Sequence, residues 1–309
     1  MRSPKIMHLE PMQMPILIKF MPEYHLNSTN QSIYTDFSGH LSLLGFYNYA
    51  KTFRNCWVTL NFDGINFIDA NLCSLLFSMI HKLKMERDVK IYIDFASVKA
   101  DLNILFRNGF INHVAGKQFV FQPFDKRDTT IPLSSFAQDD VDGYCNYIER
   151  DFLHQRGLES LKFHDREIVK TSYFEIFDNV GLHANTDQPI FVCGQYFPRQ
   201  SEVKLTLVDL GDGFLKKIAE FTKTTDKVKT GSAAIDWAVK GNSTKKGALG
   251  GSGLNSIFRY CLRTGGSMHI ISDNCYFEMT NKNITTHLIP NPFIGTTIDL
   301  IFRFLQNGN

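Results

Sequence analysis

The stretch VKLTLVDLGDG, residues 203–213, decides how the second half of this 309-residue chain is interpreted. Its apolar run over 203–209 predicts a strand, and Asp209-Leu-Gly-Asp-Gly stands where that strand ends. A carboxylate in this place lies at the floor of a pocket, and the two glycines let the backbone approach a ligand closely. Because an ionised carboxylate only accepts hydrogen bonds, Asp209 suits the exocyclic amine of adenine. The same residues also fit a hairpin turn, since Asp-Gly favours turns.

A helix is predicted over 166–180, where apolar residues recur at helical spacing. Its other face carries Glu175 and Asn179, four positions apart, so their Cβ atoms lie about 5–6 Å from one another. A carboxylate so placed can orient or deprotonate a nucleophile. The Asn carbonyl beside it is a hard oxygen ligand, suited to a Mg²⁺ ion that keeps waters and phosphate oxygens. An ordinary exposed polar face is the alternative interpretation.

Two further motifs lie closer to the C-terminus. Residues 247–254, GALGGSGL, lead into a helix predicted over 252–263. A glycine-rich turn at a helix N-terminus presents unpaired N–H groups and the positive end of the helix dipole, which together can hold phosphate. A flexible linker is the alternative. Gly295-Thr296 opens the last predicted strand, where the hydroxyl of Thr296 can bond the Asp209 carboxylate or an ordered water.

The order and spacing of these motifs resemble the GHKL family of ATP-binding domains, over about residues 145–305. The resemblance implies the Bergerat fold, a mixed sheet with helices on one face, and it implies ATP and Mg²⁺ as ligands. It implies that Glu175 is the general base and that Asn179 is the Mg²⁺ ligand. It also implies that Asp209 reads adenine and that Thr296 supports this carboxylate through water. The remaining residues of the implied ATP site are Gly211 and Gly213 in the pocket lining, Gly251 and Gly253 at the phosphates, and Leu254 beside them.

The first half of the chain alternates strand-like and helix-like patterns, which is typical of an α/β arrangement. The stretch LNFDGINFIDANL, residues 60–72, precedes an amphipathic helix predicted over 72–84, and a further strand is predicted at 119–121. Together these patterns are similar to the STAS fold of anti-sigma-factor antagonists. Phosphorylated STAS proteins carry a Ser two positions after the Asp that matches Asp69. In this chain that position is Asn71. Since Asn71 has no hydroxyl and suits a helix N-cap, we expect an interaction or sensing module.

We therefore expect an α/β protein with two domains, a STAS-like domain and a Bergerat-fold sandwich. The predicted divisions are a leader at 1–28, the STAS-like domain at 29–125, a polar linker at 126–142 and the ATP-binding domain at 143–309. A Lys-, Thr- and Gly-rich segment at 215–250 is long for a plain loop, and such segments usually form a functional lid.

The composition of the chain limits the classes of partner that we expect it to bind. Lys and Arg number 33 and Asp and Glu number 31, so the formal charge of +2 is too balanced for a chain that follows nucleic-acid phosphates. No apolar run approaches the roughly 18 residues of a membrane-spanning helix. The six cysteines form no C-x-x-C pair, which is typical of free thiols in a reducing compartment. We expect a cytoplasmic protein that binds neither nucleic acid nor membrane.

The function that these expectations favour is an Mg²⁺-dependent ATPase switch, in which ATP orders the predicted lid and hydrolysis releases it. The STAS-like domain then reports the nucleotide state to a protein partner. One alternative is a serine/threonine protein kinase of the anti-sigma type, with the hydroxyl of a partner as nucleophile. Another is a non-catalytic assembly module that binds nucleotide for structure only. GHKL domains often dimerise, so the resemblance also allows a homodimer.

Overall fold

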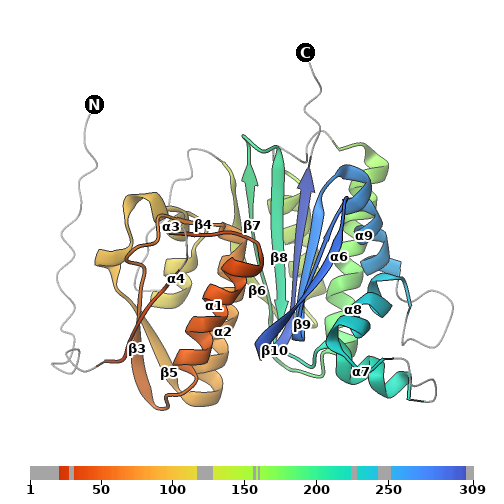
Figure 1. Ribbon diagram of the computed structural model, residues 1–309. Coiled ribbons are helices and arrows are strands. Elements are labelled where there is room, and N and C mark those ends of the chain that lie inside the picture. The colour runs from red at the N-terminus through yellow and green to blue at the C-terminus, as the bar shows by residue number, and fades with distance from the viewer. Residues whose placement is uncertain are drawn as a thin grey trace, which may run out of the picture.

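The computed structural model of the protein describes residues 21–27, 31–116, 128–155, 158, 161–223, 228–242 and 252–303. Four layers follow one another across the molecule: a small sheet, two helices, a five-stranded sheet and a group of helices (Figure 1). The first two layers come from the first half of the chain and the last two from the second half. The predicted α/β class is confirmed.

The first half is built on parallel strands in the order β1-β3-β5. Parallel neighbours need long connections, which helices α1 and α2 supply. Asp36 begins α1 by accepting a hydrogen bond from the N–H of Gly39 at 2.8 Å. The strands are β1 (Glu23–His25), β3 (Cys56–Asn61) and β5 (Val89–Ile93), with a separate parallel pair β2 (Ser32–Ile33) and β4 (Phe67–Ile68). The helices are α1 (Phe37–Ala50), α2 (Cys73–Arg87), α3 (Ile104–Arg107) and α4 (Phe110–Ala115), with 3₁₀ turns η2 (Ala70–Leu72), η3 (Phe95–Ser97) and η4 (Ala100–Leu102).

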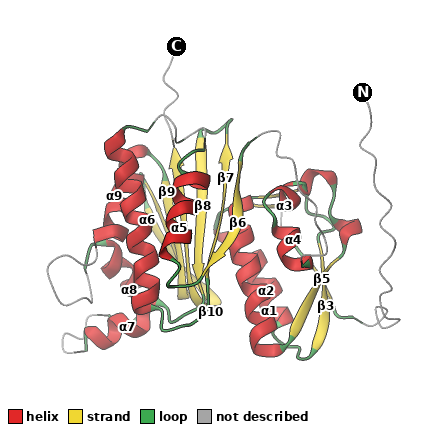
Figure 2. Ribbon diagram, turned by 180° about the vertical axis from the view of Figure 1, so that it is seen from behind, coloured by secondary structure: helices red, strands yellow, loops and turns green. Residues whose placement is uncertain are grey.

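The second half is a five-stranded sheet in the order β6-β7-β8-β10-β9, with helices against one face (Figure 2). Every pairing among its described strands is antiparallel, so the expectation of a mixed sheet is wrong. Two of these pairings are antiparallel because short hairpin connections join β7 to β8 and β9 to β10. The strands are β6 (Thr130–Phe136), β7 (Ile190–Phe197), β8 (Glu202–Asp209), β9 (Ser267–Thr280) and β10 (Ile284–Arg303). The helices are α5 (Val141–Tyr147) with the π-helical turn η5 (Ile148–Phe152), α6 (Phe163–His183), α7 (Phe214–Phe221), α8 (Gly231–Val239) and α9 (Ser252–Thr264).

The opposite face of this sheet is covered by the first half of the chain (Figure 1). Helix α2 packs on β7 and β8, and α1 packs on β10. The contact is apolar at its centre, where Leu76 of α2 and Val208 of β8 belong to one core cluster that spans both halves. The rings of Phe77 and Phe191 meet edge to face with centroids 5.7 Å apart. The five-stranded sheet is therefore buried on both faces.

Two predicted boundaries differ from the structure. The predicted linker at 126–142 contains strand β6, which pairs with β7 at the edge of the sheet. Its buried Ile131 and Leu133 alternate with more exposed residues, and Pro132 is tolerated because an edge strand leaves one side of its backbone unpaired. The predicted leader at 1–28 contains β1, a strand too short to show an alternating pattern.

The predicted lid at 215–250 contains most of helix α7 and all of α8. Helix α1 is missing from the sequence-based expectations. It has little amphipathic contrast, because the structure buries residues around much of its circumference, among them the polar His40. The strand predicted at 119–121 lies outside the described residues.

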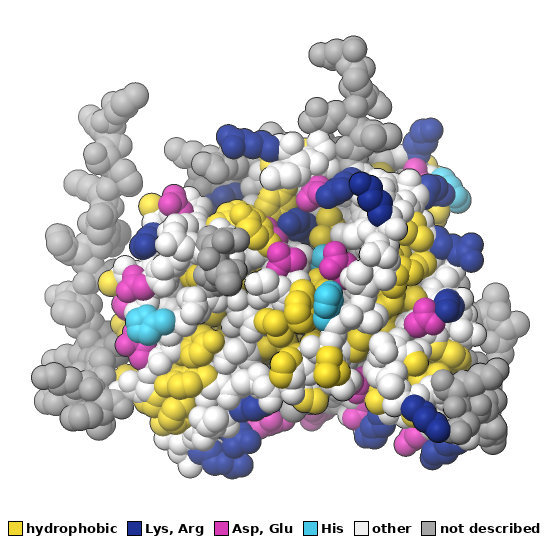
Figure 3. Space-filling view, viewed as in Figure 1, with side chains coloured by type: hydrophobic (Ala, Val, Ile, Leu, Met, Phe, Trp, Pro, Cys, Tyr) yellow, Lys and Arg dark blue, Asp and Glu magenta, His cyan; other side chains and the backbone are white. Residues whose placement is uncertain are grey.

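Three properties of the described residues bear on the expected partners and compartment: the hydropathy of the helices, the surface charge and the state of the cysteines. None of the helices described is long and apolar enough to cross a membrane. On the face drawn in Figure 3, the Lys and Arg side chains form small separate groups with acidic side chains among them. All six cysteines are free thiols, four of them buried.

Candidate functional site

A cavity of about 130 Å³ lies between the five-stranded sheet and its helices. Five residues that were predicted for the ATP site line it, and they come from α6, the end of β8, the start of α7, α9 and β10. The volume is below the roughly 300–1,000 Å³ of ligand pockets, so this cavity has room for a base rather than for a whole nucleotide. The five predicted residues are Asn179, Asp209, Gly213, Leu254 and Thr296, and the others are Ile176, Val180, Ala184, Asp212, Phe214, Lys217, Ile218, Trp237, Ala238, Asn242 and Ile298.

Asp209 is the buried acidic group of the cavity. It ends β8, and its Oδ1 accepts a hydrogen bond from the N–H of Gly211 at 2.9 Å. Burial raises the pKa of Asp209 to about 7, although hydrogen bonds from Gly211 and Thr296 act in the opposite direction. A carboxylate with this pKa gains from any further hydrogen-bond donor that enters the cavity.

Thr296 is the cross-strand partner of Asp209 in the pairing of β8 with β10. The ladder between β9 and β10 shifts register between Phe293 and Thr296, and such bulges re-aim side chains. At Gly295 φ is +122°, and a Cβ would lie 2.0 Å from the carbonyl oxygen of Asp209, so only glycine fits there. A hydrogen bond from the Thr296 side chain is among the causes that act to lower the pKa of Asp209. The sequence allowed either this direct bond or one through an ordered water.

The two glycines of the Asp-x-Gly-x-Gly motif allow close packing around the cavity. A Cβ on Gly211 would lie 2.1 Å from the carbonyl oxygen of Ala184, at the end of α6. A Cβ on Gly213 would lie 2.6 Å from Oγ of Ser272. Gly213 lines the cavity, while Gly211 holds the loop against α6 behind it.

Glu175 and Asn179 share a face of α6, but only Asn179 lines the cavity. The carboxylate of Glu175 accepts a hydrogen bond from the N–H of Gly253, at the start of α9. A Cβ on Gly253 would lie 2.4 Å from the Cβ of Glu175, so this glycine lets α9 approach α6 closely. In this structure Gly253 therefore serves helix packing. Gly251, the other predicted phosphate ligand, lies outside the described residues.

Among the lining residues that were not predicted for the site, Lys217, Trp237 and Asn242 bring a cation, an aromatic ring and an amide to the cavity. Lys217 stands on α7, and its neighbour Lys216 pairs with Asp212, another residue of the cavity lining, at 2.7 Å. The apolar spacing of α7 was the available signal for this helix, but the surrounding polar composition concealed it.

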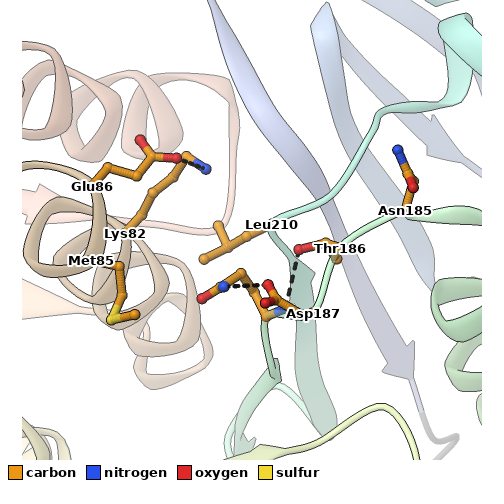
Figure 4. A pocket seen from close by; sticks show the side chains of 8 residues that line it. Lys82, Met85, Glu86, Asn185, Thr186, Asp187 and Leu210 are labelled. Carbon is orange, nitrogen blue, oxygen red and sulfur yellow. Dashed lines mark hydrogen bonds and ion pairs between the residues drawn. The ribbon is translucent and has the colours of Figure 1, made fainter.

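A larger cavity of about 580 Å³ lies between α2 and the loop at 185–188 (Figure 4). It contains none of the residues predicted for the site. Its charged groups are paired with neighbours: Lys82 with Glu86 at 2.8 Å, and Asp187 with the side-chain amide of Gln188 at 2.6 Å. We therefore take the smaller cavity as the candidate site.

The described residues contain no group of three or more His, Cys, Asp or Glu side chains that would hold a metal ion. An Mg²⁺ ion at the candidate site would thus depend on the Asn179 carbonyl, phosphate oxygens and water, a ligand set that Mg²⁺ accepts. Neither a model of a known protein family nor a curated protein matches this chain.

Proposed function

We propose that this chain is an ATP-binding switch protein, with a GHKL-type domain of the Bergerat fold following a STAS-like domain. One observation carries the proposal. Asn179, Asp209, Gly213, Leu254 and Thr296 were singled out in four separate motifs, and all five line one cavity. Unrelated surface motifs have no reason to converge in this way, which makes a common ligand the best explanation.

The end of the cavity at Asp209 suits adenine. The carboxylate there accepts from the exocyclic amine of the base, and Thr296 holds it from the neighbouring strand. Burial makes the ionised carboxylate costly while no donor is bound, so the amine relieves a desolvated charge. This gives the site its preference for a base with an amino group.

The triphosphate belongs toward Asn179 and the start of α9. The N-terminus of α9 can hold phosphate once Glu175 releases the N–H of Gly253, and Asn179 offers a carbonyl oxygen to Mg²⁺, which neutralises phosphate charge when bound. In the proposed ATPase, Glu175, one turn before Asn179, orients a water for hydrolysis. It has to give up its hydrogen bond from Gly253 before it can act as a base.

That hydrogen bond favours a second candidate function, a nucleotide-binding module without catalysis. In such a module Glu175 links α6 to α9 through its hydrogen bond with Gly253 and takes no part in hydrolysis. A protein kinase of the anti-sigma type has the same pocket and differs only in the nucleophile, a hydroxyl of another protein.

Calorimetry of ATP against the protein, with and without Mg²⁺, tests whether the site binds nucleotide, independently of whether it hydrolyses it. We expect ATP to bind, and we expect Asn179→Ala to remove the Mg²⁺-dependent part of the affinity. Asp178→Asn, on an exposed neighbouring position, is the matched control. Wild-type protein that binds no ATP would overturn the proposal.

The rate of ATP hydrolysis distinguishes the three candidate functions. The ATPase predicts that Glu175→Gln binds ATP normally and hydrolyses it at least about 10²-fold more slowly. Unchanged activity in this variant, or none in the wild type, favours the non-catalytic module. With labelled ATP, free phosphate favours the hydrolase, and label on a second protein favours the kinase.

A further inference from the structure

A set of buried polar side chains lies within the apolar contact between the two halves of the chain. Around it, Leu75 and Leu76 of α2 share a core cluster with Phe191 and Val208 of the sheet. An interface with such an apolar core is permanent, so the first half is a fixed part of the molecule. We call the buried polar set the polar seam; its members are Thr35, His40, Asp69 and Asn71 in the first half and Lys204, Thr206 and Asp299 on the sheet.

Asn71 is the centre of the seam. It has no exposed surface, and its side-chain amide donates a hydrogen bond to Oγ1 of Thr206 at 2.8 Å. The hydroxyl of Thr206 in turn donates to Oδ1 of Asp299 at 2.5 Å. Asn71 therefore does not cap a helix, as its position in the sequence suggested. Because it is buried, this segment is also closed to a second protein.

His40 completes the seam from α1. Its Nε2 lies 3.0 Å from Oδ2 of Asp299, and its Nδ1 lies 2.6 Å from the carbonyl oxygen of Asp36. Burial acts to lower the pKa of His40, but Asp299 and Asp36 together raise it, which favours the cation opposite the Asp299 carboxylate. Lys204 adds a second charged link, with Nζ 2.8 Å from Oδ2 of Asp69.

The seam and the candidate site share the same pair of strands. Thr206 is the cross-strand partner of Asp299, and Asp209 is the cross-strand partner of Thr296. The two pairs are three residues apart along β8 and β10, about 10 Å. An odd spacing turns them to opposite faces, so one pair meets the first half while the other meets the cavity.

We propose that the first half positions the nucleotide site through the sheet: Asn71 and His40, as positioning residues, fix Thr206 and Asp299 and thereby the Asp209–Thr296 pair behind them. The inference rests on the proposed function for the identity of the ligand. The links from Asn71 to Thr206, from Thr206 to Asp299 and from His40 to Asp299 form together in the alignment of β8 and β10 that the structure shows. That alignment sets where the Asp209 carboxylate stands, although no residue of the first half lines the cavity.

Two substitutions at one position test this directly. Thr206→Val keeps the shape of the side chain and removes the hydroxyl that links Asn71 to Asp299, whereas Thr206→Ser keeps the hydroxyl. We expect Thr206→Val to weaken ATP and adenosine binding by roughly 3- to 30-fold and Thr206→Ser to restore it. Val58→Ala, a buried change in β3 away from the sheet contact, is the control for general destabilisation.

A second measurement does not depend on any nucleotide. The N–H of Gly211 donates to Asp209, so its hydrogen exchange in the empty protein reports how well that carboxylate is placed. We expect faster exchange at Gly211 in Thr206→Val and in Asn71→Ala, and unchanged exchange in Val58→Ala once the three are matched for global stability. If wild-type protein binds no ATP, the proposed function fails and this exchange still decides the inference.

Three results overturn the inference. The first is nucleotide affinity and Gly211 exchange in Thr206→Val that equal those of the wild type. The second is a change in Thr206→Val that Asn71→Ala does not reproduce, because the strand alone would then be responsible. The third is an equal change in Val58→Ala. If Thr206→Val fails to fold, Asn71→Ala and its comparison with Val58→Ala give the same decision.

Discussion

The two faces of strands β8 and β10 each bury an aspartate, and the two carboxylates behave in opposite ways. Asp209 faces the cavity, and burial raises its pKa to about 7 despite hydrogen bonds from Gly211 and Thr296. Asp299 faces the first half; burial acts to raise its pKa, but His40, His269 and the hydrogen bond from Thr206 together lower it. A ligand that donates a hydrogen bond would stabilise the ionised form of Asp209, whereas Asp299 is already paired with His40.

The comparison shows what the covering layer does to each face. Helices leave a cavity of about 130 Å³ next to Asp209, whereas α1 and α2 leave Asp299 with no exposed surface. On the closed face Thr206, Asp299 and His269 stand in register across three strands. Burial lowers the pKa of His269 to about 4, so the charge on His40 is the main cationic partner of Asp299. The proposed binding site lies on the open face, and the proposed alignment network lies on the closed one.

The largest effect should come from breaking the charge pair on the closed face. Asp299→Ala leaves the cation of His40 buried without its partner, and we expect a loss of about 3–5 kcal/mol in the free energy of unfolding. Urea unfolding measures it. Asp236→Ala, which removes an exposed partner of Lys240 at 2.7 Å, should cost no more than about 0.5 kcal/mol. Similar losses in the two variants would contradict the assigned role of the buried pair.

A smaller effect is expected on the open face from Gly211→Ala. Its Cβ would lie 2.1 Å from the carbonyl oxygen of Ala184, so the loop must shift at a cost of about 1–3 kcal/mol. Because Gly211 also donates to Asp209, nucleotide affinity should fall as well. Gly181→Ala, on an exposed position of α6, should leave affinity unchanged and raise stability by up to about 1 kcal/mol. Thermal unfolding and calorimetry check both variants, and normal ATP binding by Gly211→Ala would be the contrary result.

The smallest effect concerns pH. In the proposed site the ionised form of Asp209 accepts from the amine of adenine, so we expect binding to release a proton wherever the empty site is protonated. Adenosine affinity should then rise with pH, by roughly tenfold (about 1.4 kcal/mol) between pH 6 and pH 8, because the pKa of Asp209 is about 7. Adenosine is the better probe because it has no phosphate that titrates in this range. Asp209→Asn should bind more weakly and without this slope; a flat profile in the wild type would separate Asp209 from adenine.

Much of the candidate site was predictable from the residues alone. Asp209, Asn179 and Thr296 carry side chains whose chemistry is local, and their motifs sit at the ends of elements with clear periodicity. Helix α9 was predicted within one residue at its C-terminal end for the same reason. The role of Gly253 was not predictable, since its contact with Glu175 depends on how closely α6 and α9 pack.

The first half of the chain shows where prediction from sequence stops. Asn71 stands in a recognisable pattern, yet its partner Thr206 is 135 positions away in the chain. Strand β6 looked like a linker because an edge strand with Pro132 has weak strand character by itself. The burial of His40 on α1 follows only from the sheet that covers it.

The amino-acid sequence by itself determined the local elements, the α/β class and the chemical groups available near Asp209, because periodicity and side-chain chemistry act over a few residues. Only the tertiary structure decided that the two halves share one apolar core, that the closed face of β8 and β10 is held by Asn71 and His40, and that Glu175 bonds Gly253. Those contacts join segments far apart in the chain, and their free energy comes from excluding water between surfaces that meet only in the folded molecule.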